Sequence, residues 1–249
     1  MKIDKVYIIT LDHSVENKTE LLNKMMQLGF RDSVDYYVFE GVEGKTKLAT
    51  EADRDAYGIK LYDKWVLDDT NVSWWSRNVT VGEAGGMCSH IKVWEDAYEN
   101  GYENILILED DFEPLQWFFW DAYDEIDGYD YDITFLSRIL QTSNEGVVDS
   151  EVGLEYWVKP GYSYQTHSYM LTKEGIRKLI ETNVPTLKDN IVVSDEFLPA
   201  TYTWHPRSDM RSMFIQNMNA LAYRWNPIAQ SRNQNMGNSQ TEPIEGIDY

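Results

Sequence analysis

Three consecutive acids, Glu109, Asp110 and Asp111, are the side chains of this sequence best placed to do chemistry. They directly follow residues 104–108 (NILIL), an apolar run typical of a buried strand. In open α/β sheets ligands bind at the carboxyl ends of strands, and carboxylates gathered there repel one another unless a cation neutralises them. Hard oxygen ligands suit Mg²⁺ or Mn²⁺, which proteins commonly share with substrate phosphates. The triplet therefore predicts either a metal site or an acidic loop tip in a very acidic protein.

No glycine-rich phosphate loop accompanies the acids. The sequence has no Walker or dinucleotide-binding fingerprint, and Gly85-Gly86 lies inside a helical pattern instead of following a strand. We therefore expect a nucleotide to be held through its metal, which favours sugar-nucleotide chemistry over ATP or NAD chemistry.

A helix with two buried-looking polar residues precedes the acids. Residues 80–83 (TVGE) fit a capping box and Gly101 is a stop signal, so a helix is predicted between them. Glu83 and His90 are two turns apart and share a face beside its apolar stripe. They either line a cleft, or Glu83 is only a cap and His90 only a core histidine with satisfied hydrogen bonds.

Alternating strands and helices are predicted to position these groups. Residues 6–11 form a β-branched apolar run, residues 20–28 have helical spacing before Gly29, and residues 35–39 suggest a second strand. This order is the opening of an α/β unit. The later elements predicted are strands at 104–108, 131–137, 168–171 and 221–225, a helix capped by Thr172 and running through Thr182, and a helix capped by Ser194.

Two stretches lack clear periodicity. Residues 45–78 are predicted to be short helices and loops with an aromatic cluster at Trp65, Trp74 and Trp75, which either packs in the core or stacks on sugar. The tail from Gln230 is polar and is predicted to be loop.

Composition narrows the classes of partner. The formal net charge of -20 predicts repulsion from nucleic acid and anionic membranes. The single cysteine, Cys88, excludes an internal disulfide, and no apolar stretch approaches the ~20 residues of a membrane span. A cytoplasmic protein is the expectation.

The segment from Ala200 to Gln240 is locally basic, with four arginines and one acid. These arginines either bind an anionic ligand or are solvated at the surface: Arg207, Arg211, Arg224 and Arg232.

Several motifs together resemble one known family. Residues 82–94 (GEAGGMCSHIKVW) look like the GE-x-G-x-x-x-SH-x-x-x-W signature of glycosyltransferase family 25, which includes lipopolysaccharide-type and collagen-type enzymes. The triplet at Glu109 matches the family's Glu-Asp-Asp, and residues 131–138 (YDITFLSR) resemble its next strand, which usually ends in Gly-Arg. Residues 161–172 resemble its SY-x-x-x-x-Y-x-x-S strand. Asp195-Glu196-Phe197-Leu198-Pro199, with His205-Pro206 downstream, is similar to the collagen galactosyltransferase branch.

The resemblance implies a GT-A, Rossmann-like fold: a mixed, mostly parallel sheet flanked by helices. It also implies a UDP-sugar donor, a divalent cation (Mn²⁺ or Mg²⁺) and an inverting reaction. The site residues implied are Asp111 and Glu109 for the metal, Glu109 and Asp110 for the metal or the donor ribose, Thr10 and Leu11 near the uridine, Glu83, Ser89 and His90 on the nucleotide side, Arg138 for the donor phosphates, and Asp195 and Glu196 on the acceptor side.

The chain departs from the family pattern in two places. The turn after the first strand has Asp12-His13-Ser14 where the family commonly has an arginine-rich turn, and the family's C-terminal Ser-Asp step is Ser239-Gln240. The altered turn weakens the assignment of a binding site for the donor phosphates. The second puts metal affinity, or activity itself, in question.

An inverting transfer needs a base to take the proton of the acceptor hydroxyl and a cation to hold the leaving diphosphate. Asp195 and Glu196, at the start of a predicted helix, are the candidate bases, and Glu196 is preferred. The alternative for Asp195 is plain charge compensation at a helix N-terminus.

We therefore expect one GT-A domain over residues 1–249, with a nucleotide-sugar-binding half (1–111), an acceptor-side half (112–235) and a polar tail (236–249). The expected activity moves galactose or glucose from a UDP-sugar to a hydroxyl of a glycan or protein, in a bacterial or virus-infected cytoplasm. Two alternatives stay open: a catalytically impaired sugar- or nucleotide-binding protein on the same fold, and a viral-type transferase that modifies nucleic-acid bases. The sequence does not select the sugar, the acceptor or the oligomeric state.

Overall fold

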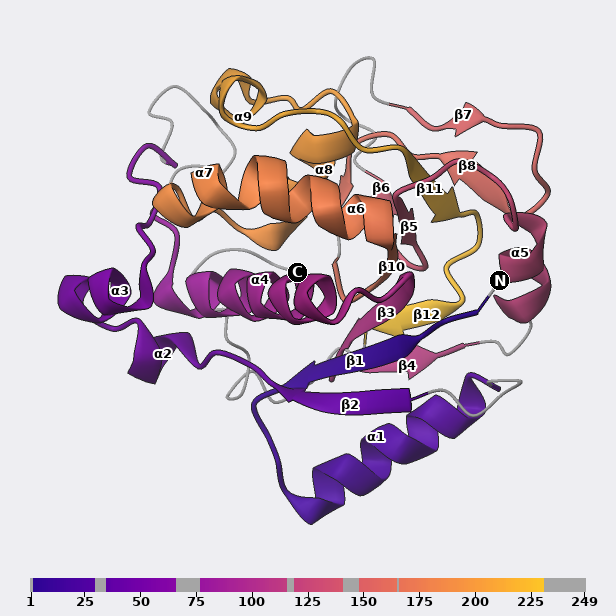
Figure 1. Cartoon of the computed structure of the whole chain (residues 1–249), viewed down its shortest axis with the longest axis horizontal. Coiled ribbons are helices and arrows are strands. Elements are labelled where there is room, and N and C mark those ends of the chain that lie inside the picture. The colour runs from indigo at the N-terminus through magenta and orange to yellow at the C-terminus, as the bar shows by residue number, and fades with distance from the viewer. Residues whose placement is uncertain are drawn as a thin grey trace.

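A mixed sheet runs through the middle of the computed structural model, which describes residues 2–29, 35–65, 77–115, 119–140, 148–164 and 166–230 (Figure 1). Within these residues the sheet has eight strands, and all of them except β10 and β8 point the same way. The order across the sheet is β2 (Asp35–Glu40), β1 (Lys5–Thr10), β3 (Asn104–Glu109), β10 (Ser168–Thr172), β5 (Ile133–Phe135), β11 (Ala220–Tyr223), β8 (Trp157–Lys159) and β7 (Ser150–Glu151). The predicted mixed, mostly parallel sheet is confirmed.

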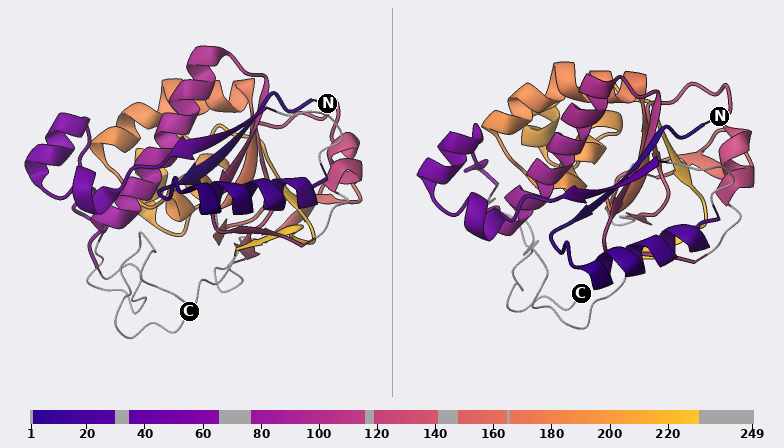
Figure 2. Two further views of the ribbon diagram at one scale, coloured as in Figure 1. Left: turned by 90° about the horizontal axis from the view of Figure 1, so that it is seen from below. Right: turned by 60° about the horizontal axis from the view of Figure 1, so that its bottom comes forward.

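Helices cover both faces of this sheet, and Figure 2 shows α1 on the opposite side from α4 and α6. One face carries α4 (Val81–Asn100), α6 (Lys173–Lys178), a π-helical segment (Leu179–Asn183), α7 (Val184–Asp189), α8 (Ser194–Tyr202) and α9 (Ser208–Met213). The other carries α1 (Val15–Gln27) and α5 (Phe119–Glu125). Smaller elements are α2 (Gly44–Lys47), α3 (Glu51–Tyr57), and the two-stranded pairs of β4 (Phe112–Pro114) with β12 (Ile228–Gln230) and β6 (Ile139–Leu140) with β9 (Ser163–Tyr164).

The apolar run of β1 explains the two layers. Successive side chains of a strand point to opposite faces, and here Tyr7 and Ile9 enter the core beneath α4 while Val6 and Ile8 enter the core beneath α1. A strand buried on both faces needs a continuous apolar sequence, and this run supplies it.

Local end signals place α4 as predicted. Thr80 and Glu83 make both hydrogen bonds of a capping box, and Gly101 ends the helix with a left-handed φ of 69° that favours glycine. The long α4 therefore begins and ends where the sequence marks it.

Other boundaries differ from expectation. Helix α1 begins at Val15, capped by Ser14, which is earlier than the predicted residues 20–28. The prediction began too late because the polar first turn lacks the apolar pattern of residues 20–28. The helix predicted from Thr172 to Thr182 changes to π geometry at Leu179. Ser194 does not cap α8; its hydroxyl bonds Thr166 instead, at 2.9 Å between the oxygens.

One sheet joins residues 1–111 and residues 112–235, because β3 of the first range pairs with β10 of the second. Within the described part of the chain, every helix is too short or too polar to cross a bilayer. Trp74, Trp75, Ser239, Gln240 and residues 236–249 lie outside the described residues.

Candidate active site

The acid triplet lies on a turn that is held on both sides. Glu109 ends β3, and Asp110 and Asp111 lead into β4. The Glu109 amide donates to the carbonyl of His167 at 2.9 Å, and the Asp110 amide donates to that of Ile9 at 3.0 Å. This fixed turn at the carboxyl ends of β1 and β3 is where an α/β sheet binds ligands.

The three carboxylates have three different partners. His90 lies 3.0 Å from Glu109 Oε1, nitrogen to oxygen, and the hydroxyl of Thr10 donates to Asp110. Gln230 Nε2 donates to Asp111 Oδ2 at 2.7 Å. The sequence predicted the triplet, Thr10 and His90 at this site, but it gave no sign of Gln230, which lies in the tail that looked like loop.

The pKa values of the three carboxyl groups are shifted in different directions. Burial raises the pKa of Asp111 to about 7, and the negative charges of Glu109 and Asp110 add to this effect. Burial is also the main reason why the pKa of Asp110 is raised. For Glu109, burial acts to raise the pKa, but the hydrogen bond with His90 outweighs it, so the pKa of Glu109 is lowered.

The two carboxylate oxygens of Asp111 have different surroundings. Its Oδ1 is buried without a hydrogen-bond partner, while its Oδ2 is oriented by Gln230. Among the described residues, however, no three His, Cys, Asp or Glu side chains converge as a metal cage. This donor set fits Mg²⁺ or Mn²⁺, which are commonly bound by one or two carboxylates and take their other ligands from substrate phosphates and water.

The residues expected near the nucleotide are only partly brought together. Thr10 is buried beside Asp110 and also accepts from Asn17 at 3.2 Å, and Leu11 follows it at the strand end. Ser89 instead ties α4 to the loop after β2, because its hydroxyl accepts from the Val42 amide at 2.7 Å.

Glu83 takes the cap role that was its alternative. Besides closing the capping box with Thr80, its carboxylate accepts from Arg77 Nη1 at 2.8 Å. It makes no described bond to the acid turn, so of the polar pair predicted on α4 only His90 reaches the acids.

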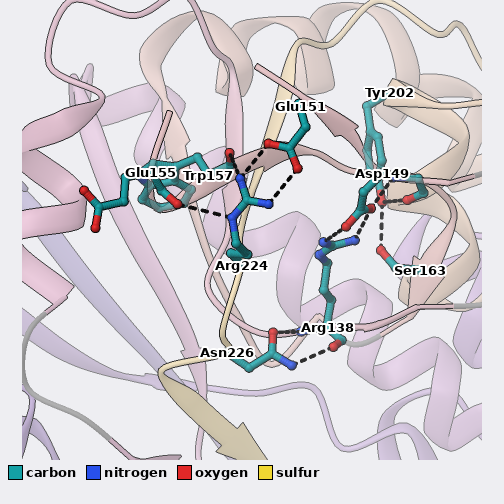
Figure 3. A network of polar contacts seen from close by, with 10 residues as sticks. Arg138, Asp149, Glu151, Glu155, Trp157, Ser163, Tyr202, Arg224 and Asn226 are labelled. Atoms are coloured by element: carbon teal, nitrogen blue, oxygen red, sulfur yellow. Dashed lines mark hydrogen bonds and ion pairs between the residues drawn. The ribbon is translucent and has the colours of Figure 1, made fainter. Parts of the chain in front are cut away.

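Arg138 has a partner other than a phosphate (Figure 3). Both of its terminal nitrogens donate to Asp149, one at 2.7 Å, and the side chain of Asn226 bonds its backbone amide and carbonyl. Arg138 is only 6% exposed. The sequence could not show that Asp149 neutralises this arginine.

Two of the arginines after Ala200 are engaged in the same way, whereas the exposed Arg211 donates to the backbone carbonyls of His205 and Pro206. Arg224 pairs with Glu151 through two bonds of 2.8 Å (Figure 3), and Arg207 is buried against Trp65 and pairs with Asp209. Arg232 lies outside the described residues. Within the described part, these two side chains are ion-paired and do not form an open basic face.

The two acids expected on the acceptor side differ in burial. Glu196 is completely buried and accepts from Tyr162 at 2.6 Å, with His205 Nε2 2.7 Å from the same oxygen. Asp195, the preceding residue in the first turn of α8, is half-buried. Of these two acids, only Asp195 is therefore partly exposed.

Comparison with known proteins decides the family. The family model described as glycosyltransferase family 25 (LPS biosynthesis protein) matches residues 3–198. The chain belongs to glycosyltransferase family 25. A glycosyltransferase 25 family member of Anopheles gambiae is 33% identical over 224 residues, which are 86% of this chain and 34% of that protein. A procollagen galactosyltransferase 1-A of Xenopus laevis is 29% identical over 92% of this chain and 36% of its own length.

This family-25 chain thus spans about a third of the length of these relatives. Among solved structures it is similar to the galactosyltransferase LgtC in complex with donor and acceptor sugar analogs, with a TM-score of 0.41 at 11% identity over 94% of this chain and 91% of that one. The family's signature segment, residues 82–94, lies in α4, and its acid triplet forms the turn after β3.

Proposed function

We propose that this chain transfers a hexose from a UDP-sugar to a hydroxyl of a glycan or protein, with a divalent cation at the acid turn. One observation carries the proposal: in a family-25 chain, Asp111 presents a buried oxygen without a partner beside two further carboxylates. The name of the Xenopus relative makes UDP-galactose the first donor to test, with UDP-glucose the second.

On the donor side, Asp111 would hold the cation through Oδ1, and Gln230 keeps the other oxygen turned away. When bound, Mn²⁺ or Mg²⁺ would neutralise the leaving diphosphate. Asp110, anchored by Thr10, adds a second negative charge beside it. Glu109 already accepts from His90 through Oε1, so we assign it to the donor's hydroxyl groups instead of the cation.

On the acceptor side, the base role moves from Glu196 to Asp195. A general base must come within hydrogen-bond reach of the acceptor hydroxyl, and a completely buried carboxylate that already accepts two bonds is unsuited to that task. Asp195 is half-buried at the N-terminus of α8. Glu196 instead holds α8 to Tyr162 and His205.

Calorimetry on the whole chain tests the donor side. UDP, UDP-galactose and UDP-glucose are titrated with and without Mn²⁺ into the wild type, Asp111→Asn, and the control Asp55→Asn on exposed α3. We expect binding that requires Mn²⁺, at least about tenfold weaker in Asp111→Asn and unchanged in the control.

If no UDP compound binds with Mn²⁺ present, the transferase proposal fails and the chain is a binding protein on the family's fold. If a donor binds, product anomers followed by NMR test inversion. Asp195→Asn should then lose turnover with little change in donor affinity, and an active Asp195→Asn enzyme would remove Asp195 from the base role.

A further inference from the structure

Four side chains from three elements form a continuous series of hydrogen bonds that ends at the acid turn. Trp94 Nε1 lies 3.0 Å from the hydroxyl of Tyr169, and that hydroxyl lies 2.8 Å from His90 Nδ1. His90 Nε2 in turn lies 3.0 Å from Glu109 Oε1. Trp94 and Tyr169 are completely buried and His90 is 2% exposed, so these bonds are shielded from water.

The chemistry of the first member fixes the direction of the whole series. An indole N–H can only donate, so the Tyr169 oxygen accepts from Trp94. Tyr169 has one hydrogen, and His90 Nδ1 is its acceptor in the core; any other arrangement leaves a buried hydroxyl hydrogen without a partner. Nδ1 of His90 is therefore an acceptor, and the proton of a neutral imidazole lies on Nε2, which faces Glu109.

Helix α4 and strands β10 and β3 place the four side chains of this series next to one another. His90 and Trp94 are one helical turn apart on α4 and share a face. Tyr169 on β10 is opposite Ile107 of β3, two residues before Glu109, so its side chain and that of Glu109 emerge on the same face of the sheet.

We infer that Trp94, Tyr169 and His90 are a positioning relay that saturates Oε1 of Glu109 and turns Oε2 toward a hydroxyl-bearing donor such as a UDP-sugar. The Glu109 side chain is 32% exposed, and no described residue bonds its Oε2. The relay accounts for the histidine and tryptophan of the segment 82–94 by a single physical task. The inference rests on the proposed function for the identity of the ligand, but not for the direction of the bonds.

Nitrogen-15 NMR of the ligand-free wild-type protein, labelled at histidine, tests the direction. The chain has four histidines, so His90→Gln identifies the His90 signals. We expect a neutral ring with its proton on Nε2. A ring protonated on Nδ1, or on both nitrogens, overturns the relay.

Tyr169→Phe tests the positioning role, with Tyr7→Phe as the matched control. The Tyr7 hydroxyl is also buried, and it donates to Asp96 on the same helix without joining the relay. In Tyr169→Phe we expect His90 to lose its single tautomer and UDP with Mn²⁺ to bind about tenfold more weakly. In Tyr7→Phe the tautomer should stay and affinity should change by less than about twofold.

Unchanged donor affinity in Tyr169→Phe overturns the positioning role. If the wild type itself binds no UDP compound, the proposed function fails separately, and the tautomer of His90 in Tyr169→Phe then decides the relay: an unaltered Nε2 proton would reject it.

Discussion

Two histidine–glutamate pairs use the same contact: His90 with Glu109 at the acid turn, and His205 with Glu196 of α8. The nitrogen-to-oxygen distances are 3.0 and 2.7 Å. In both pairs the other ring nitrogen accepts a hydrogen bond, from the Tyr169 hydroxyl for His90 and from the Arg207 backbone amide, at 3.1 Å, for His205. Both imidazoles therefore present an Nε2 proton to a carboxylate.

The pairs differ in what surrounds the carboxylate. The Glu109 side chain is 32% exposed at a strand end, whereas that of Glu196 is fully buried inside α8 and also accepts from Tyr162. A glutamate with one oxygen open to the site can bind a ligand, and one with no open oxygen can only hold the fold. Exposure, and not the pairing, therefore separates the glutamate that we propose as a binding residue from the one that we propose as a structural residue.

The largest effect is expected from Glu196→Ala. It leaves the Tyr162 hydroxyl and the His205 N–H buried without an acceptor, so we expect the free energy of unfolding to fall by about 3–5 kcal/mol. Urea unfolding measures it. Glu196→Gln, which keeps an acceptor oxygen, should lose clearly less. A loss below about 1 kcal/mol for alanine would show that Glu196 is not a structural anchor.

Glu109→Gln should behave in the opposite way. The amide oxygen can still accept from His90 and the side chain is partly exposed, so stability should change by no more than about 1 kcal/mol. Affinity for UDP with Mn²⁺ should fall about tenfold, or 1.4 kcal/mol, measured by calorimetry. If this variant loses stability and keeps affinity, the two pairs have the same role and the comparison fails.

Asp111→Asn should stabilise the ligand-free protein. Because the folded-state pKa of Asp111 is raised to about 7, the folded protein holds an extra proton between the ordinary aspartate pKa and 7, and stability falls as pH rises through that window. The asparagine lacks this penalty. We expect a gain of about 1 kcal/mol near pH 8, after allowing for partial exposure, and almost none near pH 4. Thermal unfolding at both pH values checks it, and a loss of stability near pH 8 would contradict it.

The smallest effect is expected at the other end of β3 and β10. Glu103 and Lys173 form an ion pair of 2.6 Å there, with side chains 66% and 56% exposed. Exposed pairs contribute little, so Glu103→Gln should change stability by less than about 0.5 kcal/mol and leave UDP affinity unaltered. A larger loss would mean that exposure is a poor guide to the roles of the buried pairs as well.

Local signals in the sequence predicted most of what is local in the structure. The cap at Thr80, the stop at Gly101 and the acids after β3 each depend on a few adjacent residues. The place of β10, antiparallel between β3 and β5, depends on pairing across 60 to 68 residues with β3 and 34 to 38 residues with β5, which no short pattern encodes.

The site was predictable to a similar degree. The sequence predicts the acid triplet and His90 in one cleft, and the structure places His90 beside Glu109, but the sequence does not predict the burial of Glu196 or the engagement of Arg138 by Asp149. Acids in the first turn of a helix usually face water, so Glu196 looked accessible until its tertiary neighbours were known. Gln230 carried no signal at all, because a polar residue in a polar tail is indistinguishable from its neighbours.

The pairing of β12 with β4 also bears on the order in which parts of the chain fold. Gln230 reaches Asp111 across 119 positions of the chain, and Ile228–Gln230 form the only described partner strand of the residues that follow the acid turn. The pairing of β1 with β3 also spans 100 residues, as between Lys5 and Ile105, but both of these strands are synthesised before Ile228–Gln230. A growing chain could therefore form its β1–β3 framework before the acid turn acquires its final geometry, and the proposed cation site would be among the last parts of the protein to mature.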